Sequence, residues 1–164
     1  MERAFAAKNP DNIAENYAIR GRARAVAGDY EAALADSNHA VELDAANIYN
    51  FLNRADVYRM MGEREKALAD LEKSQEIDAK NPYVYKMRGE IYNEMDEKEA
   101  ALAAYKEYWK QAPNASDIPD EYMQEVDAAA YDKIVKEREK KEQEKKEKEA
   151  AKKGTPENKM GEKP

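Results

Sequence analysis

The fold is decided by Ala14–Asn47, AENYAIRGRARAVAGDYEAALADSNHAVELDAAN, because two further copies of its pattern follow without an insertion. The copies occupy residues 48–81 and 82–115, so equivalent positions lie 34 residues apart. One column holds glycine or aspartate, and two others hold only small residues. These columns are Gly28, Gly62 and Asp96; Gly21, Ala55 and Gly89; and Ala33, Ala67 and Ala101. Agreement at one fixed period predicts a repeat architecture, in which each unit buries its apolar face against its neighbours.

Each copy reads as two helices joined by a turn. The first copy predicts helices over 13–26 and 30–43, and the second predicts helices over 48–61 and 64–77. Between the first two helices, Gly28 supplies the left-handed backbone conformation that ends a helix without steric cost. The third copy has aspartate in that column, and aspartate accepts a positive φ more readily than most residues. The predicted fold class is therefore all-α.

The fixed period, the aromatic ring that opens each copy and the small residues in two columns resemble the tetratricopeptide repeat (TPR). The rings are Tyr17, Phe51 and Tyr85. The resemblance implies an α-α superhelical solenoid, in which three helix pairs stack with a right-handed twist and the first helix of each pair lines a concave groove. It also implies a non-enzymatic scaffold or adaptor that takes a protein or peptide partner.

A short segment precedes the three repeats, which we place at 14–47, 48–81 and 82–115. Within residues 1–13, the sequence Asn-Pro-Asp-Asn looks like the turn between repeats of this family. We expect residues 1–13 to be a helical segment. It is either an N-terminal cap or the remnant of a preceding repeat in a chain excised from a longer array.

A different pattern begins after the third repeat. Over 116–135 an apolar residue recurs at every fourth position, which predicts one helix that caps the open end of the solenoid. This stripe consists of Tyr122, Val126, Ala130 and Ile134. Residues 136–153 lack an apolar stripe but carry i,i+4 pairs such as Glu142–Lys146, so a charged, solvated helix is predicted. Residues 154–164, with glycine, proline and no apolar run, are predicted to be disordered.

Composition favours a thin solenoid over one well-filled core. Of the 164 residues, 38% are charged, and the formal net charge is −7. Residues 136–164 hold 11 Lys and Arg against 8 Asp and Glu, a net charge of +3, which leaves −10 for residues 1–135. An acidic body repels nucleic acid, so nucleic-acid binding is disfavoured. No segment approaches the roughly 18 consecutive apolar residues of a membrane span, so membrane insertion is not expected.

No group of residues supports catalysis or a bound cofactor. The chain has no cysteine and a single histidine, His39, so neither thiolates nor a histidine pair can hold a metal. No glycine-rich phosphate loop follows a strand. We therefore expect no enzyme activity, no metal site and no cofactor. Without a signal peptide or disulfides, the expected location is cytoplasmic, although a fragment of an exported protein would show the same features.

One charged column is open to two interpretations. It consists of Arg20, Arg54 and Arg88. The column would form a basic ladder for an anionic ligand, or its members would pair with carboxylates on the facing helix. Asp36 and Asp70 lie 16 residues after the first two arginines, whereas the third repeat has Ala104 at that place. We favour structural pairs within the repeats, with Arg88 as the exception.

The resemblance also assigns a binding surface. In proteins of this family, peptide ligands contact positions on the first helix of each repeat. The positions that we assign to the groove are Ile19, Arg22, Tyr49, Leu52, Asn53, Asp56, Tyr83, Lys86, Met87 and Glu90. Exposed apolar patches usually mark contacts, so we expect Tyr49, Leu52, Tyr83 and Met87 to form one continuous apolar strip that binds a partner. The alternative is that several of them pack against the neighbouring helix.

One subclass of the family is not expected. Members that grip the C-terminal carboxylate of heat-shock chaperones use Lys and Asn in the first repeat, Asn in the second, and Lys and Arg in the third. The matching places hold Ala18, Arg22, Asn53, Tyr83 and Met87, of which only Asn53 agrees. The resemblance therefore predicts a scaffold without a carboxylate clamp.

Two classes of function fit these features. The first is an adaptor that binds a peptide or an extended protein segment in the groove, for which a monomer is expected. The second is a structural subunit of a larger assembly that contacts its neighbours through its ends or its long C-terminal helix, for which a defined oligomer is expected.

Overall fold

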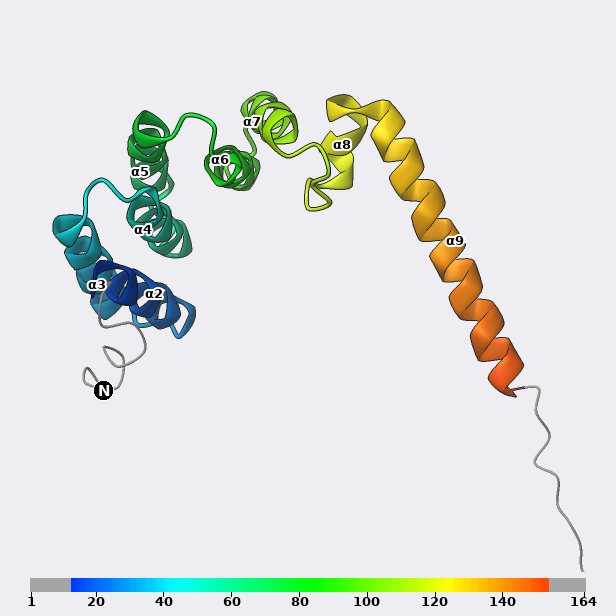
Figure 1. Ribbon diagram of the computed structural model, residues 1–164, viewed down its shortest axis with the longest axis horizontal. Helices are drawn as coiled ribbons and strands as arrows, with labels where there is room; N and C mark the ends of the chain where they lie inside the picture. The colour runs from blue at the N-terminus through cyan, green and yellow to red at the C-terminus, as the bar shows by residue number, and fades with distance from the viewer. Residues whose placement is uncertain (1–12, 154–164) are drawn as a thin grey trace, which may run out of the picture. The chain divides into compact units, whose positions relative to one another are not determined.

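The described part of the chain, residues 13–153 of the computed structural model, consists of helices and turns without a strand (Figure 1). Six helices form three hairpins, and two more helices follow. The hairpins are α2 (Ile13–Val26) with α3 (Tyr30–Leu43), α4 (Ile48–Met60) with α5 (Arg64–Ile77), and α6 (Pro82–Glu94) with α7 (Lys98–Gln111). The later helices are α8 (Asp120–Val126) and α9 (Ala128–Lys153). The predicted all-α solenoid is confirmed, and α2 to α5 agree with their predicted bounds to within one residue.

The chain divides into two compact units, one that ends at Ile118 and one that begins at Pro119. The first unit holds the hairpins, in which each helix packs on its hairpin partner and α4 also packs on α2 and α6. An apolar cluster joins the second and third hairpins. Its buried residues are Ile48, Leu52, Ala55, Ala67, Leu71, Val84 and Ile91. The core therefore runs along the stack, because each hairpin buries its apolar face only against its neighbours.

The turns inside the three hairpins share one backbone conformation. The φ angle is +83° at Gly28, +78° at Gly62 and +59° at Asp96. Side chains with a Cβ rarely adopt this region, and aspartate is among the residues that do so most readily. Asp96 thus adopts the positive φ expected of the residue that replaces glycine in the third turn.

The column of Gly21, Ala55 and Gly89 lies where the two helices of each hairpin cross. A Cβ on Gly21 would lie 2.6 Å from the Ser37 hydroxyl, and a Cβ on Gly89 would lie 2.6 Å from the Tyr105 ring. Both distances are shorter than atoms tolerate, so these helices approach too closely for a side chain. In the second hairpin Ala55 is accommodated at the same column, where Leu71 replaces the serine and the tyrosine.

The first two arginines of the charged column form ion pairs inside their hairpins. Arg20 donates to Asp36 through Nε at 2.7 Å and Nη2 at 2.6 Å, and Arg54 donates to Asp70 at 2.8 Å and 2.7 Å. Both carboxylates are buried, and two-point pairs of this kind fix geometry as well as charge. Arg88 instead donates to Gln75 Oε1 at 2.7 Å and lies 3.8 Å from Glu72, and both residues belong to α5 of the preceding hairpin. The predicted structural pairs and the predicted exception are both confirmed.

A buried asparagine holds the turn between the first two hairpins, which lacks the proline common in such turns. Asn50 donates through Nδ2 to the carbonyls of Ala40 at 3.1 Å and Asp44 at 2.8 Å. These carbonyls lie at the end of α3, and the Ala40 carbonyl also accepts a hydrogen bond from the Asp44 amide at 3.1 Å. The side chain thereby ties the start of α4 to the end of α3.

The predicted capping helix over 116–135 is two helices. The first begins at Asp120 after a proline and ends at Val126. Asp127 then has an extended backbone, with φ −157° and ψ 95°, and its carboxylate accepts a hydrogen bond from the Ala130 amide at 2.9 Å. Aspartate in this geometry caps the start of a new helix. The predicted apolar stripe is therefore shared between α8 and α9, because the capping chemistry of Asp127 overrides the four-residue periodicity.

The later part of α9 is solvated. Every residue of 136–149 is exposed, and Lys146 pairs with Glu142 at 2.7 Å as predicted. The predictions for residues 1–12 and 154–164 lie outside the described residues. Among the helices of residues 13–153, none is long and apolar enough to cross a membrane.

Candidate functional site

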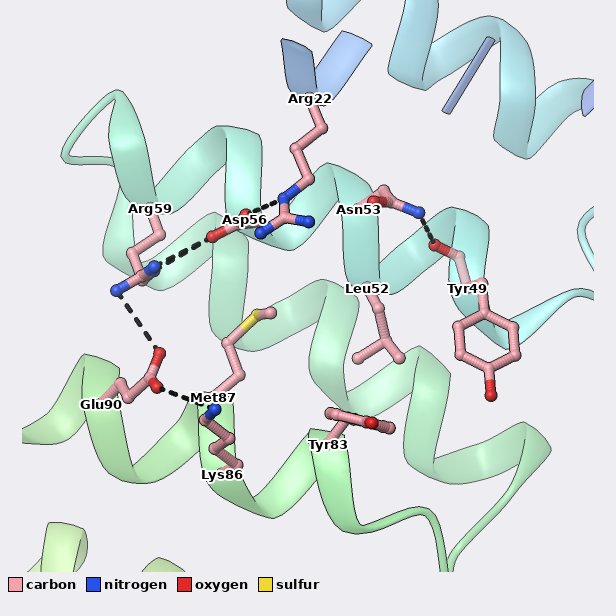
Figure 2. Close-up of a pocket in the computed structure, with 10 residues that line it drawn as sticks. All are labelled: Arg22, Tyr49, Leu52, Asn53, Asp56, Arg59, Tyr83, Lys86, Met87 and Glu90. Atoms are coloured by element: carbon pink, nitrogen blue, oxygen red, sulfur yellow. Dashed lines mark hydrogen bonds and ion pairs between the residues drawn. The ribbon is translucent and has the colours of Figure 1, made fainter. Parts of the chain in front are cut away.

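Nine of the ten predicted groove residues line one hollow of about 470 Å³ in the first unit. They project from the first helices of the three hairpins, α2, α4 and α6, toward a shared space (Figure 2). The lining consists of Arg22, Tyr49, Leu52, Asn53, Asp56, Arg59, Tyr83, Lys86, Met87 and Glu90. Of these, Arg59 was not among the ten predicted residues.

The tenth predicted residue, Ile19, lines a neighbouring hollow of about 380 Å³ with Val26 and Ala23. Arg22 and Asn53 line both hollows. Ile19 and Val26 are exposed, so the second hollow presents an aliphatic surface on α2. The two hollows together extend the concave surface across all three hairpins.

Two tyrosines occupy equivalent places at the starts of α4 and α6. Tyr49 is 54% exposed and Tyr83 is 56% exposed. An asparagine two residues before each tyrosine caps the helix, since Asn47 and Asn81 each accept a hydrogen bond from the tyrosine amide at 3.0 Å. The caps fix the two backbones, and both rings line the same hollow with Leu52 nearby (Figure 2).

The predicted strip of four exposed apolar residues is not continuous. Leu52 is only 6% exposed and belongs to the apolar cluster between the second and third hairpins. Met87 is half-buried and packs against the same cluster. Because α6 stacks on α4, the side chains at the bottom of the hollow also belong to the apolar cluster between these helices. The exposed part of the strip therefore consists of the two tyrosine rings.

A network of ion pairs crosses the hollow from α2 to α6. Asp56 on α4 is 4% exposed and accepts from Arg22 Nε at 2.8 Å and from Arg59 Nη2 at 3.0 Å. Arg59 continues to α6, where it lies 2.9 Å from Glu94 and 3.5 Å from Glu90. These contacts bridge three hairpins through one buried carboxylate (Figure 2).

A second cluster closes the network near α7. Lys86 on α6 lies 2.5 Å from the Asp117 carboxylate, which also accepts a hydrogen bond from the Tyr108 hydroxyl at 2.9 Å. Partial burial alone would raise the pKa of Asp117, but the hydrogen bonds from Lys86 and Tyr108 outweigh it and lower that pKa. The Asp117 hydrogen bond also raises the pKa of Lys86, so this pair is held in its charged form.

Arg22 and Asn53 offer polar groups at the junction of the two hollows. The Arg22 side chain is 60% exposed and reaches Asp56 through Nε. Its terminal nitrogens face the open space of the hollow (Figure 2). The Asn53 amide donates to the Tyr49 carbonyl at 2.8 Å, which leaves its carbonyl oxygen available to a ligand.

Sequence reasoning missed Asp117 and Tyr108 as parts of the site. Asp117 lies in the segment between α7 and α8, at no position of the repeat, so periodicity carries no signal for it. Tyr108 lies on the second helix of its hairpin, which the resemblance does not assign to the groove. The third repeat carries bulkier rings at its end than the other repeats do, and this difference is the sequence signal that could have identified Tyr108.

Among residues 13–153, no three or more His, Asp or Glu side chains are arranged to hold a metal ion. The charged groups of the hollow are joined to one another in ion pairs, which is the arrangement of a structural network. The hollow presents two tyrosine rings, the Asn53 amide and the charged groups of this network.

Comparison with solved structures identifies the fold. The TPR domain of Arabidopsis OM64 is 24% identical, with a TM-score of 0.57, over 64% of this chain and 88% of that domain. The first TPR of Spaghetti (RPAP3), bound to the HSP90 peptide SRMEEVD, is 19% identical, with a TM-score of 0.62, over 72% and 93%. The Sgt2 TPR domain from Aspergillus fumigatus is 23% identical, with a TM-score of 0.59, over 77% and 82%. No family model and no curated protein matches the sequence.

Proposed function

We propose that this chain, which has the fold of a TPR domain, is a non-enzymatic scaffold that binds an extended peptide segment in the hollow lined by α2, α4 and α6. The observation that carries the proposal is the pair Tyr49 and Tyr83. Both rings are more than half exposed, and both line the same concave surface one repeat apart.

These two rings contrast with other aromatic residues of the first unit. Phe51, Tyr105 and Tyr108 are buried. Burial of apolar surface stabilises a protein by about 25 cal/mol per Å², so a fold forgoes stability where it leaves rings in water. Exposed apolar surface on a concave wall usually marks a contact site, and tyrosine supplies contact area at a low cost in conformational entropy.

The shape of the surface favours an extended segment. Its apolar ends are the tyrosine rings in the larger hollow and Ile19 with Val26 in the smaller one. Between them lie Arg22 and Asn53, whose donors and acceptors suit the carbonyl and amide groups of a peptide backbone. A peptide that crosses the helices would place its side chains against the apolar residues of the two hollows and its backbone beside Arg22 and Asn53.

The similar structures support a binding role. The first TPR of Spaghetti was solved with an HSP90 peptide bound.

The test selects peptides from a random library against the full chain and measures their affinity for variants. Tyr83→Ala is expected to weaken binding by about 1 kcal/mol or more, which is about fivefold, because a few aromatic anchors carry most of the energy of a contact. Tyr30→Ala is the matched control, since Tyr30 is an exposed ring on α3 that does not line the hollow. Equal affinity for both variants would show that the hollow is not the binding site.

Size-exclusion chromatography with light scattering separates this proposal from an assembly subunit. The scaffold is expected to be a monomer that binds peptide. A defined oligomer that dissociates in the Tyr83→Ala variant would mean that a neighbouring subunit fills the hollow.

A further inference from the structure

The charges around the larger hollow neutralise one another inside the chain. Four cationic groups and four carboxylates form the network that runs from α2 to the segment after α7, and its net charge is therefore zero. Its members are Arg22, Arg59, Arg64 and Lys86, with Asp56, Glu90, Glu94 and Asp117. Each cation lies within 3.4 Å of a carboxylate. The network around the hollow thus contains cations but carries no excess positive charge that would attract an anion.

Asp117 neutralises the charge of Lys86 at the end of the hollow nearest α7. Its carboxylate is 2.5 Å from the Lys86 ammonium, and the Tyr108 hydroxyl holds the other carboxylate oxygen at 2.9 Å. A carboxylate from a ligand that approached Lys86 would have to displace one that is already fixed by a second hydrogen bond. Breaking such a charge-assisted bond costs more than a new exposed pair returns.

Apart from the Arg22 terminal nitrogens and the Asn53 carbonyl oxygen, the surface that remains without a partner is apolar. It consists of the Tyr49 and Tyr83 rings, together with Ile19 and Val26. A neutral aliphatic or aromatic side chain would bury this surface and would leave the ion pairs in place. A carboxylate would gain little from the paired cations and would lose its own hydration.

We propose that the hollow selects an uncharged peptide segment bearing aromatic or aliphatic side chains, that it gives no preference to a free C-terminal carboxylate or an acidic segment, and that Asp117 is the residue that determines this specificity by occupying Lys86. This inference rests on the proposed function, because it names the class of ligand for the same surface.

The experiment uses the full chain and a library of random peptides displayed with free C-termini. Peptides selected on the wild type are synthesised in two forms that differ only at the end, as the free acid and as the amide. Affinities of both forms are measured for the wild type, Asp117→Asn, the double variant Asp117→Asn/Lys86→Gln, and Asp120→Asn. Asparagine can still accept the Tyr108 hydrogen bond, so Asp117→Asn removes the charge and keeps the acceptor. Asp120 pairs with Arg138 in the second unit and is the matched control.

The wild type and Asp120→Asn are expected to bind the acid and the amide equally, within about twofold. Asp117→Asn is expected to bind the acid about fivefold more tightly than the amide, the effect of roughly one freed ion pair. The double variant is expected to lose that gain, because the freed ammonium is then absent. The comparison of the two forms on the wild type needs no variant, so it decides the question even if Asp117→Asn does not fold.

The failures are distinguishable. Wild-type binders that require the free acid and also require Tyr83 would overturn this inference and leave the proposed function standing. Equal binding of both forms by Asp117→Asn would remove the role of Asp117. A library that yields no binder to the wild type would overturn the proposed function, and this inference would fall with it.

Discussion

Tyr49 and Leu52 are three residues apart on α4 and line the same hollow, yet they have different environments. The tyrosine is capped by Asn47 at the start of the helix and remains in solvent, whereas the leucine packs in the cluster with Ile48 and Val84. A residue that lines a concave surface can therefore belong either to the surface or to the core below it. The two cases differ in what a truncation should change.

At this scale, Leu52→Ala is expected to reduce the free energy of unfolding by about 2–5 kcal/mol, since it leaves a cavity in a packed cluster. Tyr49→Ala is the control from the same helix and should cost less than about 1 kcal/mol, because its ring is mostly in water. Urea unfolding of both variants gives the values. A small loss for Leu52→Ala would mean that its side chain is held only by a ligand.

The Asp117 carboxylate predicts a pH dependence with a definite sign. Its folded pKa lies below the ordinary value of 3.8, so its contribution is fully present above that value and is lost as the pH falls through the lower folded pKa. Asp117→Asn should be less stable than the wild type at neutral pH, and the difference should shrink in acid. Urea midpoints of both proteins at several pH values measure it. A difference that does not change with pH would show that Asp117 acts through shape alone.

Between helices, the deciding quantity is how closely the two members of a hairpin approach. The third hairpin combines a glycine on α6 with a tyrosine on α7, and the second combines an alanine on α4 with a leucine on α5. In the third hairpin only α7 contributes a side chain to the crossing, whereas in the second hairpin both helices contribute one. The residue pair of the second hairpin can therefore be placed in the third hairpin to test whether it restores stability.

Gly89→Ala is expected to cost about 1–3 kcal/mol, because the added methyl group would lie 2.6 Å from the Tyr105 ring. The double variant Gly89→Ala/Tyr105→Leu has the residue pair of the second hairpin and should recover part of the loss. Thermal or urea unfolding of the single and double variants tests this. A double variant no better than the single one would show that the crossing distance differs between the hairpins.

For the whole molecule, periodicity predicted the three hairpins, and the family resemblance assigned ten groove residues, of which nine line one hollow. It could not predict that Leu52 lies beneath the surface, because burial there depends on how α6 stacks on α4. Nor could it predict Asp117, which lies at no repeat position, or the break at Asp127, where a local cap interrupts a regular stripe. Repetition predicts what every hairpin shares, and the features that distinguish one hairpin depend on single contacts.

Two truncations compare the charged end of α9 with the segment after α7. Of the described side chains, a chain that ends at residue 135 loses the exposed ones of 136–149, with the ion pairs among them and that of Arg138 with Asp120. Both members of that pair are about half exposed, and such pairs contribute about 0–1 kcal/mol. The melting temperature should therefore stay nearly unchanged.

A chain that ends at residue 116 also loses the Asp117 contacts with Lys86 and Tyr108 and the buried side chain of Ile118. It should melt at a distinctly lower temperature, because an acceptor and an apolar contact of the first unit are both removed. Calorimetry of the full chain and of the two truncated chains compares the losses. Equal melting temperatures for the two truncated chains would show that the segment after α7 does not stabilise the hairpins, and the Asp117 cluster would then lose its structural role.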